Sequence, residues 1–294
     1  LGRVVPAELT RTVLDSAFFW PKQSQLENST LRSLWAVLKQ AFNQAFIFEM
    51  IQNNMMAGLQ YSDFINAKIQ PKANQIKTNQ VPALLLASDQ ANKPYQVLML
   101  FMLLHGTRLG ETRRLKWAMI DYDANTLLIP GALTKNKQDH AIPLTPYALQ
   151  VLNVYRAYQK KHRYNGVWLF PNKPRKNSIN ADQANKWIQT LSGGDWCSHS
   201  LRKVFRTICL DIGVDYLIGE LLLNHSLSKL DITYMGDYAQ IQKRLALNKY
   251  HAWLDDYTGF YLSQYGVETL TRCDVKTMHL KPNKDAGLTH EWGD

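Results

Sequence analysis

The sequence predicts a mainly α-helical protein with a small antiparallel β-sheet, arranged as two domains. Along most of the chain apolar residues recur every three or four positions, which is the period of an amphipathic helix. Between residues 117 and 144 this pattern gives way to three short segments of β character. A chain of 294 residues has room for about two domains.

The first domain is expected to be helical and to cover residues 1–75. A periodic pattern begins at Leu9 and is broken by Pro21. Asn28 and the two residues after it supply an N-cap for a long periodic helix that reaches Phe46, and a shorter helical stretch contains Tyr61, Phe64 and Ile65. The polar run from Lys72 to Pro82 has no period and predicts a linker, placed at 76–85.

The second domain is expected to cover residues 86–265. Its three strands are predicted at 117–121, 126–130 and 140–144, with a hairpin loop over 131–139. Helical patterns surround them and predict helices at 83–88, 95–105, 182–191, 201–212, 216–223 and 241–261, and from Pro146 to Ala157.

The net charge of +10 favours an anionic partner such as nucleic acid or an anionic membrane surface. Residues 86–265 carry 22 basic and 14 acidic groups, so most of the excess lies in the second domain. The window 140–181 contains no acidic residue. We interpret it as a track for phosphates rather than as a solvated charged face. Its candidate DNA-binding residues are Lys160, Lys161, Arg163, Lys173, Arg175 and Lys176.

The three cysteines indicate a reduced intracellular protein, because Cys197, Cys209 and Cys273 form no CxxC pair and are odd in number. No second ligand pair supports a zinc site at Cys197. The apolar run from Val97 to Leu104 is too short to span a bilayer. Since the chain begins with Leu1 rather than Met, we expect a fragment that lacks the true N-terminus.

Six residues suggest the chemistry. Arg108 lies in Gly-Thr-Arg-Leu-Gly-Glu, Lys135 in Thr-Lys, His199 and Arg202 in His-Ser-Leu-Arg, and His225 in Leu-Asn-His-Ser, followed by Tyr234. Five groups that carry positive charge or donate hydrogen bonds thus precede one phenol. Such a set suits attack on a phosphodiester, because negative charge builds on the phosphate oxygens and a phosphotyrosine can hold the intermediate.

These motifs resemble those of the tyrosine recombinases of the phage-integrase family. That family has a Gly-x-Arg-x-Gly-Glu segment, a hairpin Lys, a His-x-Leu-Arg box, a Leu-Gly-His-Ser box and a Tyr nine residues after the last His. Tyr234 follows His225 by nine residues here. One departure is Asn224, where the family usually has Gly. Asn tolerates the left-handed backbone conformation better than most residues, so we expect the turn to survive.

The resemblance implies a role for each of the six. Arg108 and Arg202 would hold the scissile phosphate, and His225 would donate to one of its non-bridging oxygens. His199 would accept the proton of Tyr234.

The sixth residue is Lys135, and three further residues compete with these assignments or support them. Lys135 would protonate the departing 5′ oxygen, with Lys137 as its competitor, because a lysine can release a proton and an arginine cannot. Tyr238 is the rival nucleophile. Glu111 is interpreted as orienting an arginine or a backbone amide, since a carboxylate repels phosphate.

The implied function is that of a site-specific recombinase, an integrase of a phage or other mobile element, which acts through a 3′-phosphotyrosine without metal, ATP or other cofactor. By the family's pattern, two domains would clamp double-stranded DNA and four protomers would exchange strands, with DNA-bending or directionality proteins as accessory partners. The place of action would be the cytoplasm of a bacterial or phage-infected cell. Further candidate DNA contacts are Arg32, Lys39, Lys137, Lys203 and Arg206.

Two other functions remain as alternatives: a type IB topoisomerase-like enzyme that relaxes DNA, and a catalytically silent DNA-binding regulator. A metal-dependent nuclease would need clustered carboxylates, which the motifs lack. The tail 266–294 carries no motif. We expect it either to dock on a neighbouring protomer or to form a self-packed or disordered terminus.

Overall fold

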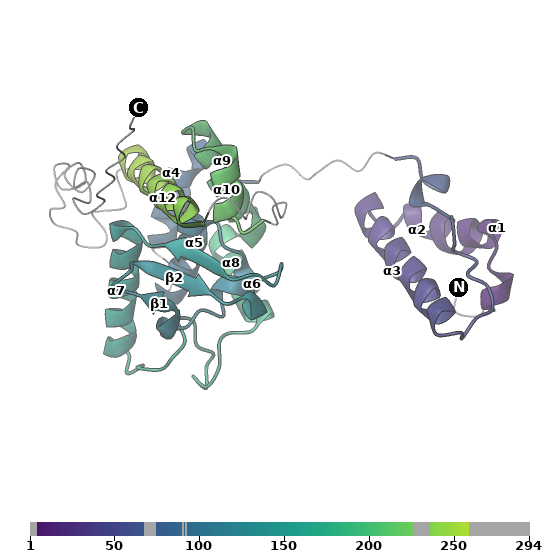
Figure 1. Cartoon of the computed structure of the whole chain (residues 1–294), viewed down its shortest axis with the longest axis horizontal. Helices are drawn as coiled ribbons and strands as arrows, with labels where there is room; N and C mark the ends of the chain where they lie inside the picture. The colour runs from purple at the N-terminus through teal and green to yellow at the C-terminus, as the bar shows by residue number, and fades with distance from the viewer. Residues whose placement is uncertain (1–4, 68–74, 90, 92, 226–235, 259–294) are drawn as a thin grey trace, which may run out of the picture. The chain divides into compact units, whose positions relative to one another are not determined.

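The computed structural model describes residues 5–67, 75–89, 91, 93–225 and 236–258. The chain divides into two compact units, Leu1–Ala73 and Asn74–Asp294, which Figure 1 draws from purple to blue and from blue through teal to yellow. Each unit has a hydrophobic core of its own.

The described part of the first unit consists of helices, turns and loops. Thr10 caps the first helix, because its hydroxyl accepts a hydrogen bond from the N–H of Val13 at 3.2 Å. The predicted break at Pro21 is wrong: this residue lies in the first turn of α2, directly after a π-helical turn, where the absent N–H is tolerated. The helices are α1 (Arg11–Leu14), the π turn (Asp15–Phe19), α2 (Trp20–Gln23) and α3 (Asn28–Ile47), with 3-10 turns at Pro6–Glu8 and Tyr61–Asp63.

Aromatic rings dominate the core of the first unit. Phe19 stacks on Phe64 with the ring centroids 4.4 Å apart, and it packs against Trp35 at 5.2 Å. The helical stretch predicted around Phe64 is only a single 3-10 turn, Tyr61–Asp63, because the carboxylate of Asp63 binds the backbone N–H of Gln60 and closes the turn.

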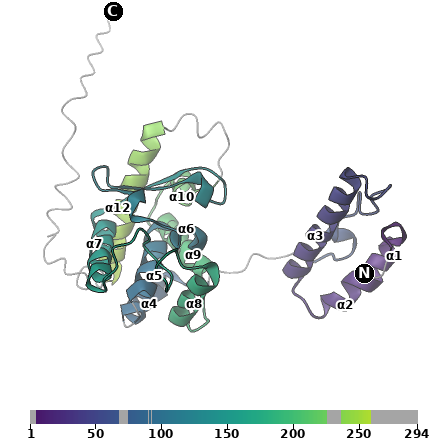
Figure 2. The same ribbon diagram turned by 90° about the horizontal axis from the view of Figure 1, so that it is seen from below.

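The second unit is built around α5. Its helices are α4 (Val81–Asp89), α5 (Lys93–His105), α6 (Leu109–Thr112), α7 (Pro146–Lys161), α8 (Ala181–Ser192), α9 (Ser198–Asp211), α10 (Tyr216–Leu222) and α12 (Gly236–Thr258). Every residue from Gln96 to His105 is buried, and α5 contacts α4, α6, α7, α8 and α9. It runs through the middle of the unit in both views (Figure 1, Figure 2).

The predicted three-stranded antiparallel sheet is confirmed. Its strands are β1 (Ile120–Asp121), β2 (Thr126–Ile129) and β3 (His140–Pro143), in the order β1-β2-β3. The first strand is shorter than predicted because Trp117–Met119 forms a 3-10 turn. The ammonium of Lys243 on α12 donates to the carbonyl of Ala141 and ties that helix to β3.

The linker predicted at 76–85 is wrong for these residues. Thr78–Gln80 is a 3-10 turn, and α4 begins at Val81. Ile76, Val81 and Leu85 are buried in the core of the second unit. Val81 and Leu85 lie four residues apart, the spacing of a helical face, whereas Ile76 stands among polar residues.

Candidate active site

The site begins at Gly106, where α5 ends. The N–H of Gly106 donates to the carbonyl of Met102 at 2.8 Å, and its φ of +61° turns the chain away from the helix axis. A Cβ atom here would lie 2.6 Å from the Phe205 ring and 2.7 Å from the Leu223 side chain. Only glycine fits both the backbone conformation and the space, and the turn carries Arg108 to the start of α6.

Arg108 is held in place by Glu111. One oxygen of this buried carboxylate accepts from Nη1 of Arg108 at 3.0 Å, and the other accepts from its backbone N–H at 3.2 Å. The prediction that Glu111 orients an arginine or a backbone amide is therefore confirmed, and it does both. About a quarter of the Arg108 side chain remains exposed, at 26%, so the guanidinium is fixed and still accessible.

Arg202 forms the floor of the site. It is buried on α9, where its guanidinium donates to the carbonyl of Gly106 at 2.5 Å and to the carbonyl of Leu223. Burial and the nearby charge of Arg108 lower its pKa to about 10, so it stays charged at neutral pH. Arg108 and Arg202 line one cavity of about 190 Å³ together with His199. Two fixed positive charges at one cavity form a binding place for an anion.

His199 lies in the first turn of α9 and is exposed. Partial desolvation and the positive charges of Lys203, Arg202 and Arg108 lower its pKa. Its imidazole is therefore mostly neutral at pH 7 and can accept a proton. This agrees with the predicted role of a proton acceptor.

His225 follows α10 and contacts Glu220. Nδ1 of His225 lies 2.5 Å from Oε2 of Glu220, and Nε of Arg206 donates to the other carboxylate oxygen at 2.8 Å. Partial burial raises the pKa of Glu220, but the hydrogen bonds from His225 and Arg206 outweigh it, and the net pKa is lowered. The ionised carboxylate accepts a hydrogen bond from Nδ1–H of His225, so Nε2 is left to contact a substrate. Glu220 was not among the residues predicted from the sequence, where a carboxylate five residues before the histidine was the only signal.

Lys135 is exposed on the loop between β2 and β3, as predicted. Burial and the positive charges of Lys243, Arg202 and Arg108 lower the pKa of His140, at the base of this hairpin, to about 3. Within the loop, Asn136 pairs with Asn224 through both side-chain amides. The structure thus joins the loop of Lys135 to the cluster of Arg108, His199, Arg202 and His225, which we call the Arg-His cluster.

The predicted nucleophile, Tyr234, lies outside the described residues, as do residues 266–294 of the tail. The helix α12 begins at Gly236, two positions after Tyr234. The rival, Tyr238, lies on α12 and is 61% exposed.

The predicted DNA-binding residues do not all present free side chains. Arg206 is mostly buried: besides Glu220, it contacts the ring and carbonyl of Tyr216. Lys39 donates to the carbonyl of Leu59 at 2.6 Å. Lys203 is half-buried on α9. The side chains of the remaining candidates are exposed, namely Arg32, Lys137, Lys160, Lys161, Arg163, Lys173, Arg175 and Lys176.

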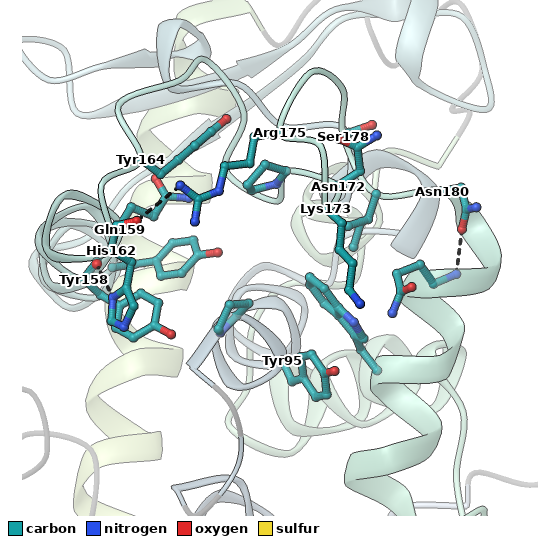
Figure 3. A pocket seen from close by; sticks show the side chains of 16 residues that line it. Tyr95, Tyr158, Gln159, His162, Tyr164, Asn172, Lys173, Arg175, Ser178 and Asn180 are labelled. Atoms are coloured by element: carbon teal, nitrogen blue, oxygen red, sulfur yellow. Dashed lines mark hydrogen bonds between the residues drawn. The ribbon is translucent and has the colours of Figure 1, made fainter.

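A second, larger cavity of about 610 Å³ lies at the other end of α5 (Figure 3). It is lined by Tyr95, stacked on Trp187 at 4.6 Å, and by Lys173 and Arg175. A helix rises about 1.5 Å per residue, so the ten residues from Tyr95 to His105 separate this cavity from the Gly106 turn by about 15 Å. Arg175 donates to the carbonyls of His162 and Arg163 and is thereby engaged within the loop.

Within the described ranges, no helix is both long and apolar enough to cross a membrane. The same part of the chain holds no group of three His, Cys, Asp or Glu side chains that could bind a metal ion. Cys197 and Cys209 are free thiols.

The phage integrase family model matches residues 74–242, which is more than half of the chain. The chain is 29% identical to the prophage integrase IntA of Escherichia coli K12, over 51% of this chain and 36% of that protein. It is 25% identical to the tyrosine recombinase XerC of Chlamydia muridarum, over 48% of this chain and 45% of that one. The matches therefore span less than half the length of these two relatives.

Two solved structures share the fold. The integrase of the Tn1549 transposon, in complex with transposon right end DNA, superposes with a TM-score of 0.62 at 17% identity, covering 84% of this chain and 88% of that one. A lambda integrase dimer bound to a COC′ core site gives a TM-score of 0.59 at 15% identity, covering 79% and 65%. The likeness confirms the predicted fold class.

Proposed function

Because the chain belongs to the phage integrase family, we propose that it is a site-specific DNA recombinase that cuts and rejoins DNA through a 3′-phosphotyrosine at Tyr234. One observation supports this most strongly. Arg108 and Arg202, far apart in the sequence, line one small cavity with His199, and both are held by hydrogen bonds before any substrate arrives. Preorganised donors of this kind stabilise the charge that develops on a phosphate in the transition state.

In the proposed reaction the hydroxyl oxygen of Tyr234 attacks the phosphorus, and the bond between phosphorus and the 5′ oxygen breaks. Arg108, Arg202 and Nε2 of His225 hold the non-bridging oxygens. His199 takes the phenol proton, and Lys135 gives a proton to the departing 5′ oxygen. A 5′ hydroxyl from a partner strand then attacks the phosphotyrosine and releases Tyr234, so the number of phosphoester bonds is conserved.

The partners follow from this chemistry. Double-stranded DNA is the proposed substrate; the Tn1549 and lambda integrase structures named above are complexes with DNA. We propose four protomers on two DNA sites, with accessory DNA-bending or directionality proteins, acting in the cytoplasm where the DNA lies. The element would be a phage or another mobile element.

A suicide substrate, nicked beside the cleavage site, tests the assignment. Incubated with a chelator and run on a denaturing gel, the wild-type chain is expected to give a covalent protein–DNA band. Tyr234→Phe should bind the same DNA and give none, because it loses one hydroxyl and little packing volume. A band that persists in Tyr234→Phe would refute the assignment and transfer it to Tyr238.

Two assays separate the alternatives. A recombinase joins two DNA sites into recombinant products, whereas a topoisomerase-like enzyme relaxes supercoils without exchanging partners. A silent regulator binds DNA and forms no covalent band with any substrate.

A further inference from the structure

Asn224 makes a contact that the glycine usual at this position in the family cannot make. The residue is buried, at 8% exposure, and has a φ of +50°. Its side-chain oxygen accepts from Nδ2 of Asn136 at 3.0 Å, and its own Nδ2 donates to Oδ1 of Asn136 at 3.3 Å. Asn136 also donates to the backbone carbonyl of Asn224 at 3.3 Å. We call this two-residue contact the amide clasp.

The amide clasp joins two catalytic segments. Asn136 is the residue after Lys135, and Asn224 is the residue before His225. Other bonds fix the base of the loop: Arg114 donates to the carbonyl of Leu133 at 2.6 Å, and Asp139 accepts from the N–H of Gly131 at 2.7 Å. Those bonds hold the loop to the turn that follows α6 and to itself. The clasp holds it to the segment that carries His225.

We propose that Asn136 and Asn224 are positioning residues, which set Lys135 at a fixed place relative to the phosphate held by the Arg-His cluster. This inference rests on the proposed recombinase function. A lysine side chain is long and flexible, so the position of its backbone determines how often the ammonium meets the departing oxygen. Displacing a reacting group by about 1 Å can cost up to about a hundredfold in rate.

The clasp acts on one step only. When the phosphorus–oxygen bond to the 5′ oxygen breaks, that oxygen takes its proton from Nζ of Lys135, and the amine is left neutral. Anion binding by Arg108 and Arg202 does not pass through the loop. Loss of the clasp should therefore slow leaving-group protonation and spare DNA binding.

The test compares Asn136→Ala and Asn224→Gly on two suicide substrates, one with the ordinary 5′ oxygen and one with a bridging 5′ sulfur. A thiolate leaves without a proton, so the sulfur substrate does not need Lys135. Asn224→Gly preserves the positive φ without strain and removes only the amide. Lys135→Ala is the reference for complete loss of the acid.

With the oxygen substrate, each clasp variant is expected to cleave about tenfold more slowly than wild type. With the sulfur substrate, both should approach the wild-type rate, as should Lys135→Ala. The double variant should be no slower than either single one, since both remove the same interaction. Asn43→Ala, which breaks the exposed Asn54–Asn43 amide pair of the first unit, is the matched control and should cleave both substrates normally.

Equal slowing on both substrates would overturn the proposal, because it would mean that the clasp only stabilises the fold. Unchanged cleavage of the oxygen substrate by the two variants would overturn it too. Failure of the recombinase function has a different signature: the wild-type chain itself would form no covalent band with either substrate.

Discussion

Nδ1 of His225 and the carboxylate of Glu220 lie 2.5 Å apart, and the same carboxylate accepts a hydrogen bond from Arg206 at 2.8 Å. One acid thus orients the imidazole of His225, which we propose contacts the phosphate, and joins α9 to α10. Orientation of an imidazole by a carboxylate is a recurrent feature of sites where the opposite ring nitrogen meets the substrate.

Replacing Glu220 by Gln should slow covalent complex formation at least about tenfold, because the amide loses the negative charge that accepts hydrogen bonds from His225 and Arg206. The contribution of Glu220 to the free energy of unfolding should also change with pH. The folded-state pKa of Glu220 is lowered below its ordinary 4.5, so its stabilising effect is present above that pH and is lost as pH falls through the folded-state pKa.

Thermal unfolding of both proteins at several pH values checks this. The melting temperature of Glu220→Gln should lie below that of wild type at pH 7, and the two should converge in acid. A gap that stayed constant down to pH 3 would contradict the ionised pair.

Gly106→Ala should destabilise the fold by about 2–4 kcal/mol, adding the cost of a left-handed alanine to that of overpacking. Gly193→Ala is the matched control, because it has nearly the same φ of +60° but no atom within 4 Å of the added Cβ. In urea unfolding, the free energy of unfolding of this control should be about 1–2 kcal/mol lower than that of wild type. Equal losses in the two variants would mean that Phe205 and Leu223 give way to the methyl group.

Lys243→Met should raise the free energy of unfolding at pH 7 by about 1–2 kcal/mol, because removing the buried charge gains more than losing the hydrogen bond to the carbonyl of Ala141 costs. Burial lowers the pKa of Lys243 from 10.5 to about 8. Below pH 8 the lysine is charged in both states, and the folded state carries the full cost of burying that charge. Between pH 8 and 10.5 the folded protein loses the proton first, so the cost disappears.

The advantage of Lys243→Met in melting temperature should therefore shrink as pH rises from 7 to 10. Lys249→Met, an exposed lysine on the same helix, should have little effect at any of these pH values. An advantage of Lys243→Met that did not change with pH would show that its charge carries no cost.

Two groups of basic residues should behave differently on DNA. Lys160 and Lys161 are exposed at the end of α7, so replacing both by Ala should reduce the slope of log affinity against log salt by about 0.9 for each phosphate that is no longer neutralised. Arg175 is bonded to the carbonyls of His162 and Arg163 and lies over the ring of Tyr164. Arg175→Ala should lower the melting temperature and leave the slope unchanged.

Fluorescence anisotropy over a salt series measures the slope. If Arg175→Ala reduced the slope and the Lys160 and Lys161 replacements did not, then Arg175 rather than the two lysines would neutralise DNA phosphates.

The sequence predicted the elements whose pattern is local. The three strands and the long helices have periods that can be read directly, and the left-handed conformation of Asn224 follows from its residue type. The predictions that were wrong, and the residues that were missed, depend on contacts between residues distant in the sequence. Glu220 and Asn136 acquire their roles from partners distant in the sequence, and Arg206 was assigned to phosphate because its contact with the partly buried Glu220 could not be predicted. Ile76 was hidden among polar neighbours.

The bonds of Arg202 constrain how this chain can evolve. Its guanidinium holds the carbonyls of Gly106 and Leu223, which precede Arg108 and His225 respectively. Losing it would leave two buried acceptors without donors, so the fold would suffer together with the chemistry. His199 is exposed and can be lost at little structural cost, whereas loss of Arg108 would leave the buried carboxylate of Glu111 without its cationic partner. A descendant that gives up strand cleavage and persists as a DNA-binding protein is therefore expected to lose His199 first and to retain Arg202.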